Sequence, residues 1–480
     1  MADRGIFGVV ERPAHFGFAQ PILKAVRKSL PFGPQLKAVG FGQAIACLEH
    51  REEACAFAMY AGEFCFSDEC IVTAAPLLFV ETMGSDHWQA SLYNLSWLRH
   101  FTISKRKLHV HFALRLVGRW AKTSKSRQSL AILSRAIIAL CTHGQILARS
   151  ADAQSQAEFF SLISKVSSRL NRLNARSAQE AFLQALAGLY LCTAFYGFEK
   201  LLQTASEALN PAIKELATAD GGMLTRDPLD MIDAMMLLSP LQDAMKLNRQ
   251  VFPAAAKDAL QRMHPMLAMM TQEDGELSSV FSTDQQCHRI ASLKALDSNA
   301  VPPTLASQAG YARLVGEKSN LFIDTQKDHA FEFSIGEQRL FTSVCESPIH
   351  ETLTHLHDSQ HGVALQVIQS EGNERIYFLS KDGTDFRVED RFDRAIEITF
   401  ILAPQVKIAA RREGGVMLIE PDKSIWNLSL RGGEVHVEKN GTVLKITSVA
   451  IGKMNWAFKR QAKLSKSPQR KKPAEPDLLS

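Results

Sequence analysis

Residues 375–390 read RIYFLSKDGTDFRVED, and this stretch indicates the fold of the C-terminal half. Apolar side chains alternate on both sides of Asp382-Gly383, a pair that supplies the positive φ angles of a tight hairpin turn. Short runs of this kind recur along residues 308–458. Further turn pairs lie at Gly414-Gly415, Gly432-Gly433 and Asn440-Gly441. The pattern predicts a large antiparallel β-sandwich.

Upstream of about residue 305 the apolar residues recur at helical spacing instead. Ser129 to Arg149 predicts one helix, and Ser177-Ala-Gln-Glu180 is a capping box that opens an apolar run as far as Leu202. Asp227-Pro228 and Pro253 each begin another helix, the latter running to about Thr271. Several helices with short connections indicate stacked antiparallel hairpins. A helical half followed by a β half predicts two domains rather than one mixed sheet.

Composition excludes some classes of protein. No apolar run reaches 18 residues, so no membrane span is predicted, and the start of the chain lacks the apolar segment of a secretory signal. The eight cysteines show no CxxC pair. We therefore expect reduced thiols and a cytoplasmic protein, with the periplasm or cell envelope as the alternative.

The net charge of +5 comes from the C-terminal end alone. Residues 459–480 hold seven Lys or Arg and two acids; the rest of the chain has 55 − 7 = 48 basic and 50 − 2 = 48 acidic side chains, a net of zero. This basic segment predicts a solvated, disordered tail. Contact of the tail with nucleic acid or an anionic membrane is the alternative. The net charge gives no information about a basic active cleft, and no nucleic-acid partner is expected.

Several short motifs in order along the chain carry a family resemblance. They are Gly62-Glu-Phe, Trp97-Leu-Arg99, Asp220-Gly-Gly-Met-Leu-Thr-Arg-Asp-Pro228, Gly310-Tyr-Ala-Arg313, His329-Ala-Phe-Glu-Phe333, Gln338-Arg-Leu340, His350-Glu-Thr-Leu-Thr354 and Tyr377 to Phe392. On them the chain resembles the heparinase II/III-like proteins as a divergent member. The resemblance implies an α+β multidomain fold, with an N-terminal incomplete (α/α) toroid followed by a C-terminal antiparallel β-sandwich.

The predicted domains follow from this comparison. Residues 1–125 form a mixed N-terminal part of the helical domain, 126–305 the toroid core, 306–458 the sandwich and 459–480 the tail. The family's characterised members are polysaccharide lyases that cleave uronate-containing glycans by β-elimination. That reaction needs a group that neutralises the uronate carboxylate, a base for the C5 proton and an acid for the leaving oxygen.

Candidate residues of the helical half follow the same resemblance. His143 lies where the lyases carry an Asn-His pair, and Arg226 could bind a carboxylate through two parallel hydrogen bonds. For His143 the alternative is a histidine that caps a helix or lies at the edge of the core. For the segment around Arg226 the alternative is the end of one helix and the start of the next. Asp230 falls where the family has its catalytic tyrosine, and a carboxylate does not share a phenol's pKa range. Asn94, Trp97, Arg99 and His100 are candidates for lining the cleft, although a buried Trp97 is the alternative.

Candidate residues of the β half are histidines. His350 matches a family histidine, and with His329 it is a candidate for proton transfer. His329, Cys345 and His350 have ligand types suited to a structural zinc ion, and no other cofactor is predicted. His355 and His357 would share one face of a strand. The alternative for His350 to His361 is a solvated histidine-rich loop.

The sequence thus predicts a polysaccharide lyase that acts on an acidic polysaccharide or oligosaccharide. A non-catalytic glycan-binding or assembly protein with a degenerate site is the first alternative, and a scaffold without a sugar partner is the second. The oligomeric state is not indicated.

Overall fold

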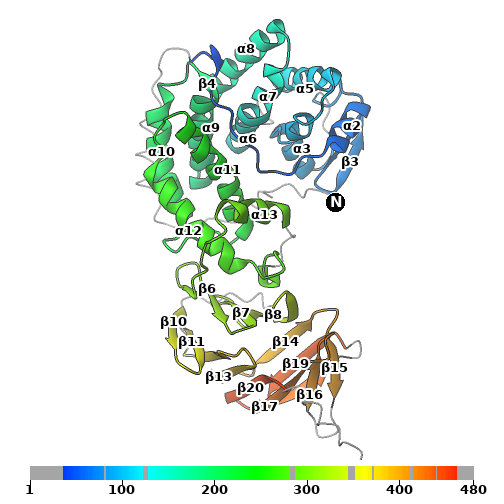
Figure 1. Cartoon of the computed structure of the whole chain (residues 1–480), viewed down its shortest axis with the longest axis vertical. Helices are drawn as coiled ribbons and strands as arrows, with labels where there is room; N and C mark the ends of the chain where they lie inside the picture. Colours follow the sequence, from blue (N-terminus) through cyan, green and yellow to red (C-terminus); the bar gives the residue numbers. More distant parts are fainter. Residues whose placement is uncertain are drawn as a thin grey trace, which may run out of the picture. The chain divides into compact units, whose positions relative to one another are not determined.

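A computed structural model describes residues 36–79, 83–122, 128–281, 287–343, 352–369, 372–410, 415–438 and 441–461. The chain divides into two compact units. The helical unit holds the described residues up to Thr271 together with Gly275–Leu277 and Phe281–Ala309. The sandwich unit holds Gln272–Asp274, Ser278–Val280 and the described residues from Gly310 onward. The helical and β halves follow one another as the change of period predicts (Figure 1).

The helical unit begins with a short strand and a hairpin among its first helices. Its elements are β1 (Gly40–Phe41), α2 (Glu53–Ala61), β2 (Glu63–Phe66), β3 (Glu69–Val72), α3 (Asp86–Tyr93), α4 (Leu98–Phe101), α5 (Lys107–Trp120), α6 (Leu130–Ala139), the π-turn η2 (Leu140–Gly144), α7 (Gln145–Arg149), α8 (Ala153–Leu170), α9 (Ala178–Ala194), β4 (Phe195–Tyr196), α10 (Leu201–Leu216), α11 (Pro228–Leu247), α12 (Ala254–Met270) and α13 (Cys287–Leu296).

Helix starts follow the capping residues seen in the sequence. The Ser177 hydroxyl accepts the backbone N–H of Glu180 at 3.2 Å, and Asp227 accepts that of Leu229 at 2.9 Å with Pro228 as the first helical residue. The helix that Ser177 opens ends at Ala194, so the predicted continuation to Leu202 is wrong. Phe195 is extended there because it pairs with Phe41 in a two-stranded sheet.

Residues 130–149 form one continuous helical stretch, as predicted, but a π-turn interrupts it in the middle. By length and composition alone Leu130–Arg149 could cross a membrane. In the structure 78% of that window is buried, as is usual for the core helix of a folded domain.

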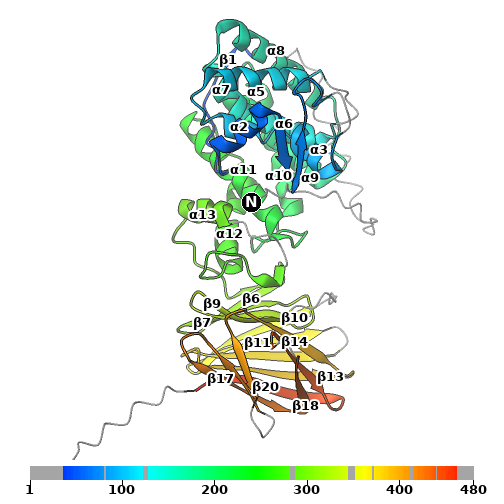
Figure 2. The ribbon, with the colours of Figure 1, turned by 90° about the vertical axis from the view of Figure 1, so that its right-hand side faces the viewer.

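The sandwich unit consists of two antiparallel sheets (Figure 2). One sheet has the order β10-β11-β12-β13-β20-β17-β16-β15, and the other contains β18-β19-β14-β9-β8-β7-β6. The strands are β6 (Tyr311–Val315), β7 (Ser319–Asp324), β8 (Ala330–Ile335), β9 (Gln338–Ser343), β10 (Thr352–Asp358), β11 (Gly362–Gln369), β12 (Glu374–Ser380), β13 (Asp385–Phe392), β14 (Glu397–Leu402), β15 (Lys407–Ala410), β16 (Val416–Ile419), β17 (Ile425–Arg431), β18 (Gly433–Val437), β19 (Val443–Ser448) and β20 (Gly452–Arg460); β5 (Leu305–Ala306) precedes them.

Aromatic rings from both sheets fill the space between them. Phe331 of β8 stacks on Trp456 of β20 with ring centroids 5.8 Å apart, and Phe341 of β9 lies 4.7 Å from Phe458. Large rings bury much apolar area for few residues, so these contacts form the core of the unit.

The hairpin predicted at Asp382-Gly383 is confirmed as β12 and β13. The Asp382 carboxylate accepts the Thr384 backbone N–H at 3.1 Å, and Gly383 has φ +68°. A Cβ at Gly383 would lie 2.3 Å from the Ser319 hydroxyl, so glycine is required there for packing as well as for the turn.

Two expectations need correction. Lys459 and Arg460, assigned to the tail, end β20, where Lys459 is in register with Asp385 and Arg460 with Trp426; residues 462–480 lie outside the described part. Cys65 and Cys70 are joined as a disulfide rather than held as free thiols. They stand opposite each other in the β2–β3 hairpin, a pairing that the lack of a CxxC motif concealed.

Candidate functional site

His143 is presented by the π-turn in the middle of the 130–149 helix. Its side chain is only 6% exposed. The neighbouring Thr142 hydroxyl donates to the Ile138 carbonyl at 2.9 Å, which fixes the start of the turn. The Nδ1 atom of His143 has no hydrogen-bond partner among the described residues. Single π-turns occur often at functional sites, and a buried ring nitrogen without a partner indicates a place for a ligand or water.

Three basic side chains affect the pKa of His143. Burial, and then the positive charges of Arg99, Arg51 and His100, lower the pKa of His143 from 6.5 to about 3. The imidazole is therefore neutral at pH 7 and offers a polar N–H or a lone pair rather than a charge. We call Arg51, Arg99, His100 and His143 the His143 cluster.

The residues of the His143 cluster are held by the extended segment that leads into α2. Arg99 donates from Nε to the His50 carbonyl at 3.0 Å, and the Nδ1 atom of His100 accepts the Glu52 backbone N–H at 3.0 Å. Because Nδ1 of His100 accepts, the neutral ring carries its proton on Nε2. Arg51 is exposed and forms no ion pair with any described residue. The cluster thus combines a rim cation, a buried cation and two imidazoles, a set suited to an anion.

A second polar group contains the buried carboxylate of Asp233 on α11. Arg135 of α6 donates to it at 3.0 Å, Arg289 of α13 forms a second, short ion pair with it, and Arg289 also lies 3.3 Å from Glu49. Buried charges are tolerated only when paired in this way. The group ties α6, α11 and α13 to the same segment, residues 49–52, that holds the His143 cluster.

Arg226 and Asp230 flank the start of α11. Arg226 has φ +59°, and its backbone N–H donates to the Met223 carbonyl at 2.9 Å. Asp230 lies in the first turn of α11; burial, and then the nearby Asp227 and Asp233 carboxylates, raise its pKa, against a hydrogen bond from Thr225. The charges of Arg99, Arg51 and His100 shift the pKa of His143. The pKa of Asp230 is instead shifted by the charges of Asp227, Asp233 and Arg135.

The predicted cleft residues before α5 separate into two kinds. Asn94 ends α3 and accepts the Ser96 backbone N–H at 2.8 Å, and Arg99 belongs to the His143 cluster. Trp97 is 2% exposed, and its indole N–H donates to the Leu92 carbonyl at 2.9 Å. Its ring is therefore buried in the core, which is the alternative given for Trp97 in the sequence analysis.

His329 occupies a buried network of the sandwich unit. Its Nε2 atom lies 2.7 Å from an Arg375 guanidinium nitrogen and 3.3 Å from Asp328, while Arg375 forms a short ion pair with Asp390. Arginine can only donate, so Nε2 accepts and the ring proton resides on Nδ1. Burial, and then Arg375 and Arg394, hold the pKa of His329 well below its ordinary value.

That arrangement does not fit the predicted zinc ion. Neither ring nitrogen of His329 has a lone pair left to ligate a metal, and a cation beside Arg375 would be repelled. Among the described residues no group of three or more His, Cys, Asp and Glu side chains is placed to hold a metal ion. The other two predicted ligands, Cys345 and His350, lie outside the described residues.

The site also contains residues that sequence reasoning missed, namely Glu49, Arg51, Arg135, Asp233 and Arg289. Two signals were available. Glu49 to Glu53 is a run of five ionisable residues, and Asp233 is a carboxylate inside an otherwise apolar helical stripe. Neither signal identifies its partners, because these come from elements far apart in the sequence.

Comparison with known proteins identifies the fold of this chain through solved structures of low sequence identity. No family model matches the chain, and no curated protein matches it. Among solved structures, heparinase III (the BT4657 gene product) superimposes with a TM-score of 0.61 at 12% identity, over 86% of this chain and 84% of that one. A mutant of heparan sulfate lyase HepC from Pedobacter heparinus gives 0.61 at 11% identity, over 92% and 88%. A further heparinase III structure gives 0.61 at 10% identity. The predicted toroid-plus-sandwich fold is thereby confirmed.

Proposed function

We propose that this protein is a polysaccharide lyase that binds the carboxylate of an acidic, uronate-containing glycan at the His143 cluster. The observation that carries the proposal is the buried Nδ1 atom of His143, which lacks a partner among the described residues and stands under the influence of Arg99 and Arg51. The fold shared with heparinase III and heparan sulfate lyase supports the choice of a glycan as ligand.

The cluster suits the charge change of β-elimination. When a base removes the C5 proton, its electron pair forms the C4–C5 double bond, the bond from C4 to the leaving oxygen breaks, and that oxygen takes up a proton. Negative charge builds on the uronate carboxylate before the bond breaks. Arg51, Arg99 and a donating N–H of His143 would stabilise it in a partly buried place, where such contacts are strongest.

Proton transfer is assigned to other groups than His143. A base with a pKa of about 3 accepts a proton poorly at neutral pH. His350 stays the sequence-based candidate for this role. Arg226, at the start of α11, remains the candidate for a second carboxylate contact.

A protein that binds an acidic glycan without cleaving it is the second candidate. It is supported by Asp230, which stands where the resemblance places a catalytic tyrosine and which has a raised pKa through burial. An aspartate at this position does not provide the phenol that the family uses as base and acid.

One experiment separates these two functions. Uronate-rich polysaccharides are incubated with the protein, and the near-ultraviolet absorbance of an unsaturated uronate is followed while binding is measured by calorimetry. We expect Arg51→Met and His143→Gln each to lower the cleavage rate and the affinity about tenfold or more, since each removes one charge-assisted or buried hydrogen bond. Arg172→Met, an exposed arginine after α8, is the matched control.

The outcomes are distinct. Binding without absorbance change supports the glycan-binding alternative. Neither binding nor cleavage, or equal loss in the Arg172→Met control, contradicts a glycan site at the His143 cluster.

We also propose the cell envelope or periplasm as the compartment, in preference to the cytoplasm. The Cys65–Cys70 disulfide supports this choice, because such bonds persist in oxidising environments. Cell fractionation with an antibody against the protein tests it, and recovery in the cytoplasmic fraction with free thiols would refute it.

A further inference from the structure

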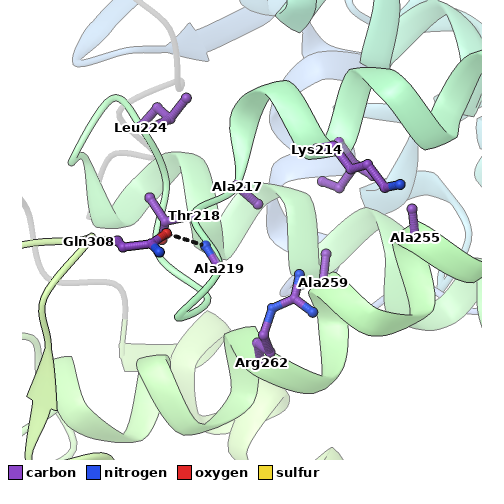
Figure 3. Close-up of a pocket in the computed structure, with 10 residues that line it drawn as sticks. Lys214, Ala217, Thr218, Ala219, Leu224, Ala255, Ala259, Arg262 and Gln308 are labelled. Atoms are coloured by element: carbon purple, nitrogen blue, oxygen red, sulfur yellow. Dashed lines mark hydrogen bonds between the residues drawn. The ribbon is translucent and has the colours of Figure 1, made fainter.

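A pocket of about 400 Å³ lies in the helical unit between α10 and α12, away from the His143 cluster. The two helices run side by side, and the loop after α10 closes one end (Figure 3). Its lining residues are Ile213, Lys214, Ala217, Thr218, Ala219, Leu224, Ala255, Ala259, Arg262 and Gln308. None of them belongs to the His143 cluster or to the Asp233 ion pairs.

The closing loop is held rigidly in place. Asp220 accepts the backbone N–H groups of Gln308 and Ala309 at 2.8 and 3.0 Å, and the Gln308 side chain accepts the Ala219 N–H at 3.0 Å, the dashed bond of Figure 3. Gly221 has φ +96°, and a Cβ there would lie 2.2 Å from the Arg262 carbonyl. The loop therefore approaches α12 as closely as the backbone permits, and the pocket wall is preformed.

The lining combines an apolar wall with two cations. Methyl and aliphatic groups come from both helices and from the closing loop, and Figure 3 shows Lys214 on α10 and Arg262 on α12 with Ala259 between them. Both cations are exposed, and neither forms an ion pair with an acid in the described part of the chain. No acidic side chain is among the described residues that line the pocket.

We infer that this pocket is a second binding site, for a small organic anion with an apolar body and a carboxylate or sulfate head group. The body would lie on the alanine and leucine wall, where burial of apolar area is favourable. The head group would accept from the Lys214 ammonium and the Arg262 guanidinium, the stronger class of hydrogen bond. The volume falls in the range of small-ligand pockets. The inference does not rest on the proposed lyase activity.

Octanoate is the probe, titrated calorimetrically into the full chain at low salt. We expect one site with a dissociation constant of about 1 mM or below, as for a ligand of this size. Acetate, which has the head group alone, and octanamide, which has the body without the charge, should bind at least about tenfold more weakly.

Substitutions locate the site. Lys214→Met and Arg262→Met keep most of the apolar stem and remove the charge, so each should weaken octanoate binding about tenfold. Ala255→Leu places extra atoms in the pocket and should abolish binding. The matched controls are Lys257→Met and Ala254→Leu, exposed neighbours on α12 that do not line the pocket. Circular dichroism and melting temperature confirm folding of each variant.

Such an anion has two sources, the end of a glycan and a free organic acid. A uronate-containing disaccharide distinguishes them. Competition with octanoate that is lost in Lys214→Met identifies a glycan end as the ligand, and absence of competition identifies a free organic acid. The inference is overturned if octanoate shows no saturable binding, if acetate or octanamide binds as tightly, or if the control variants lose binding equally.

Discussion

Acidification should destabilise the helical unit through His143. The folded ring has a pKa of about 3 because it is buried beside Arg99 and Arg51, whereas the unfolded ring has its ordinary value of 6.5. Below pH 6.5 the unfolded chain therefore binds a proton that the folded chain excludes. The stability associated with a neutral His143 is complete above pH 6.5, falls as the pH decreases, and is lost near pH 3.

The magnitude follows from the same two values. Each pH unit in this window costs about 1.4 kcal/mol of unfolding free energy. At pH 4.5, two units below 6.5, the loss through His143 alone is about 3 kcal/mol relative to the stability well above pH 6.5. That is a large part of the 5–15 kcal/mol that typically stabilises a folded protein.

The assay compares the full-length protein with His143→Gln, whose side chain keeps a hydrogen-bonding group but cannot ionise. Hydrogen–deuterium exchange of peptides from α6 and α9 reports opening of the helical unit at pH 7 and pH 4.5, after correction for the intrinsic exchange rate. Groups other than His143 titrate equally in both proteins, so the difference between them isolates this residue. His111→Gln serves as control, because His111 is exposed on α5 and its ring is solvated in both states.

A His143→Gln variant that loses as much stability on acidification as the parent protein would contradict this prediction. It is also refuted if the ring resonance of His143, assigned by its disappearance in the variant, titrates near pH 6.5. An acidic ligand at the cluster should raise the His143 pKa, because a carboxylate offsets the influence of Arg99 and Arg51.

Three further predictions concern the sandwich unit and the chain end. The pKa of the buried Glu332 is raised chiefly by burial, so the sandwich should lose stability as the pH rises above 4.5, and Glu332→Gln should remove that dependence in urea unfolding at pH 5 and 8. Arg375→Met leaves Asp390 buried without its guanidinium partner and should cost about 3–5 kcal/mol of unfolding free energy, whereas Arg387→Met, at an exposed ion pair, should cost under about 1 kcal/mol. Truncation after Gln461 should leave the melting temperature within about a degree, since the basic composition beyond it predicts little buried apolar area; a fall of several degrees would contradict this.

The sequence by itself determined the order of the two structural classes and the start of several helices. Alternation with period two and recurrence at 3.6 residues are local properties, as are the caps at Ser177 and Asp227 and the hairpin turn at Asp382-Gly383. Each of these features depends on residues only a few positions apart, so all of the interacting groups lie within one short stretch of sequence. The resemblance of the ordered motifs then extended the prediction to the toroid and sandwich.

Only the tertiary structure decided the composition of the site. The His143 cluster joins residues about 50 and 90 positions apart, the Asp233 group joins residues from 49 to 289, and neither pairing leaves a trace in local spacing. The same holds for Trp97, whose burial depends on the helices packed around it, and for Cys65, whose partner is fixed by strand register. A buried pKa shift requires knowing which charges lie close in space, and this is a property of the folded chain rather than of its sequence pattern.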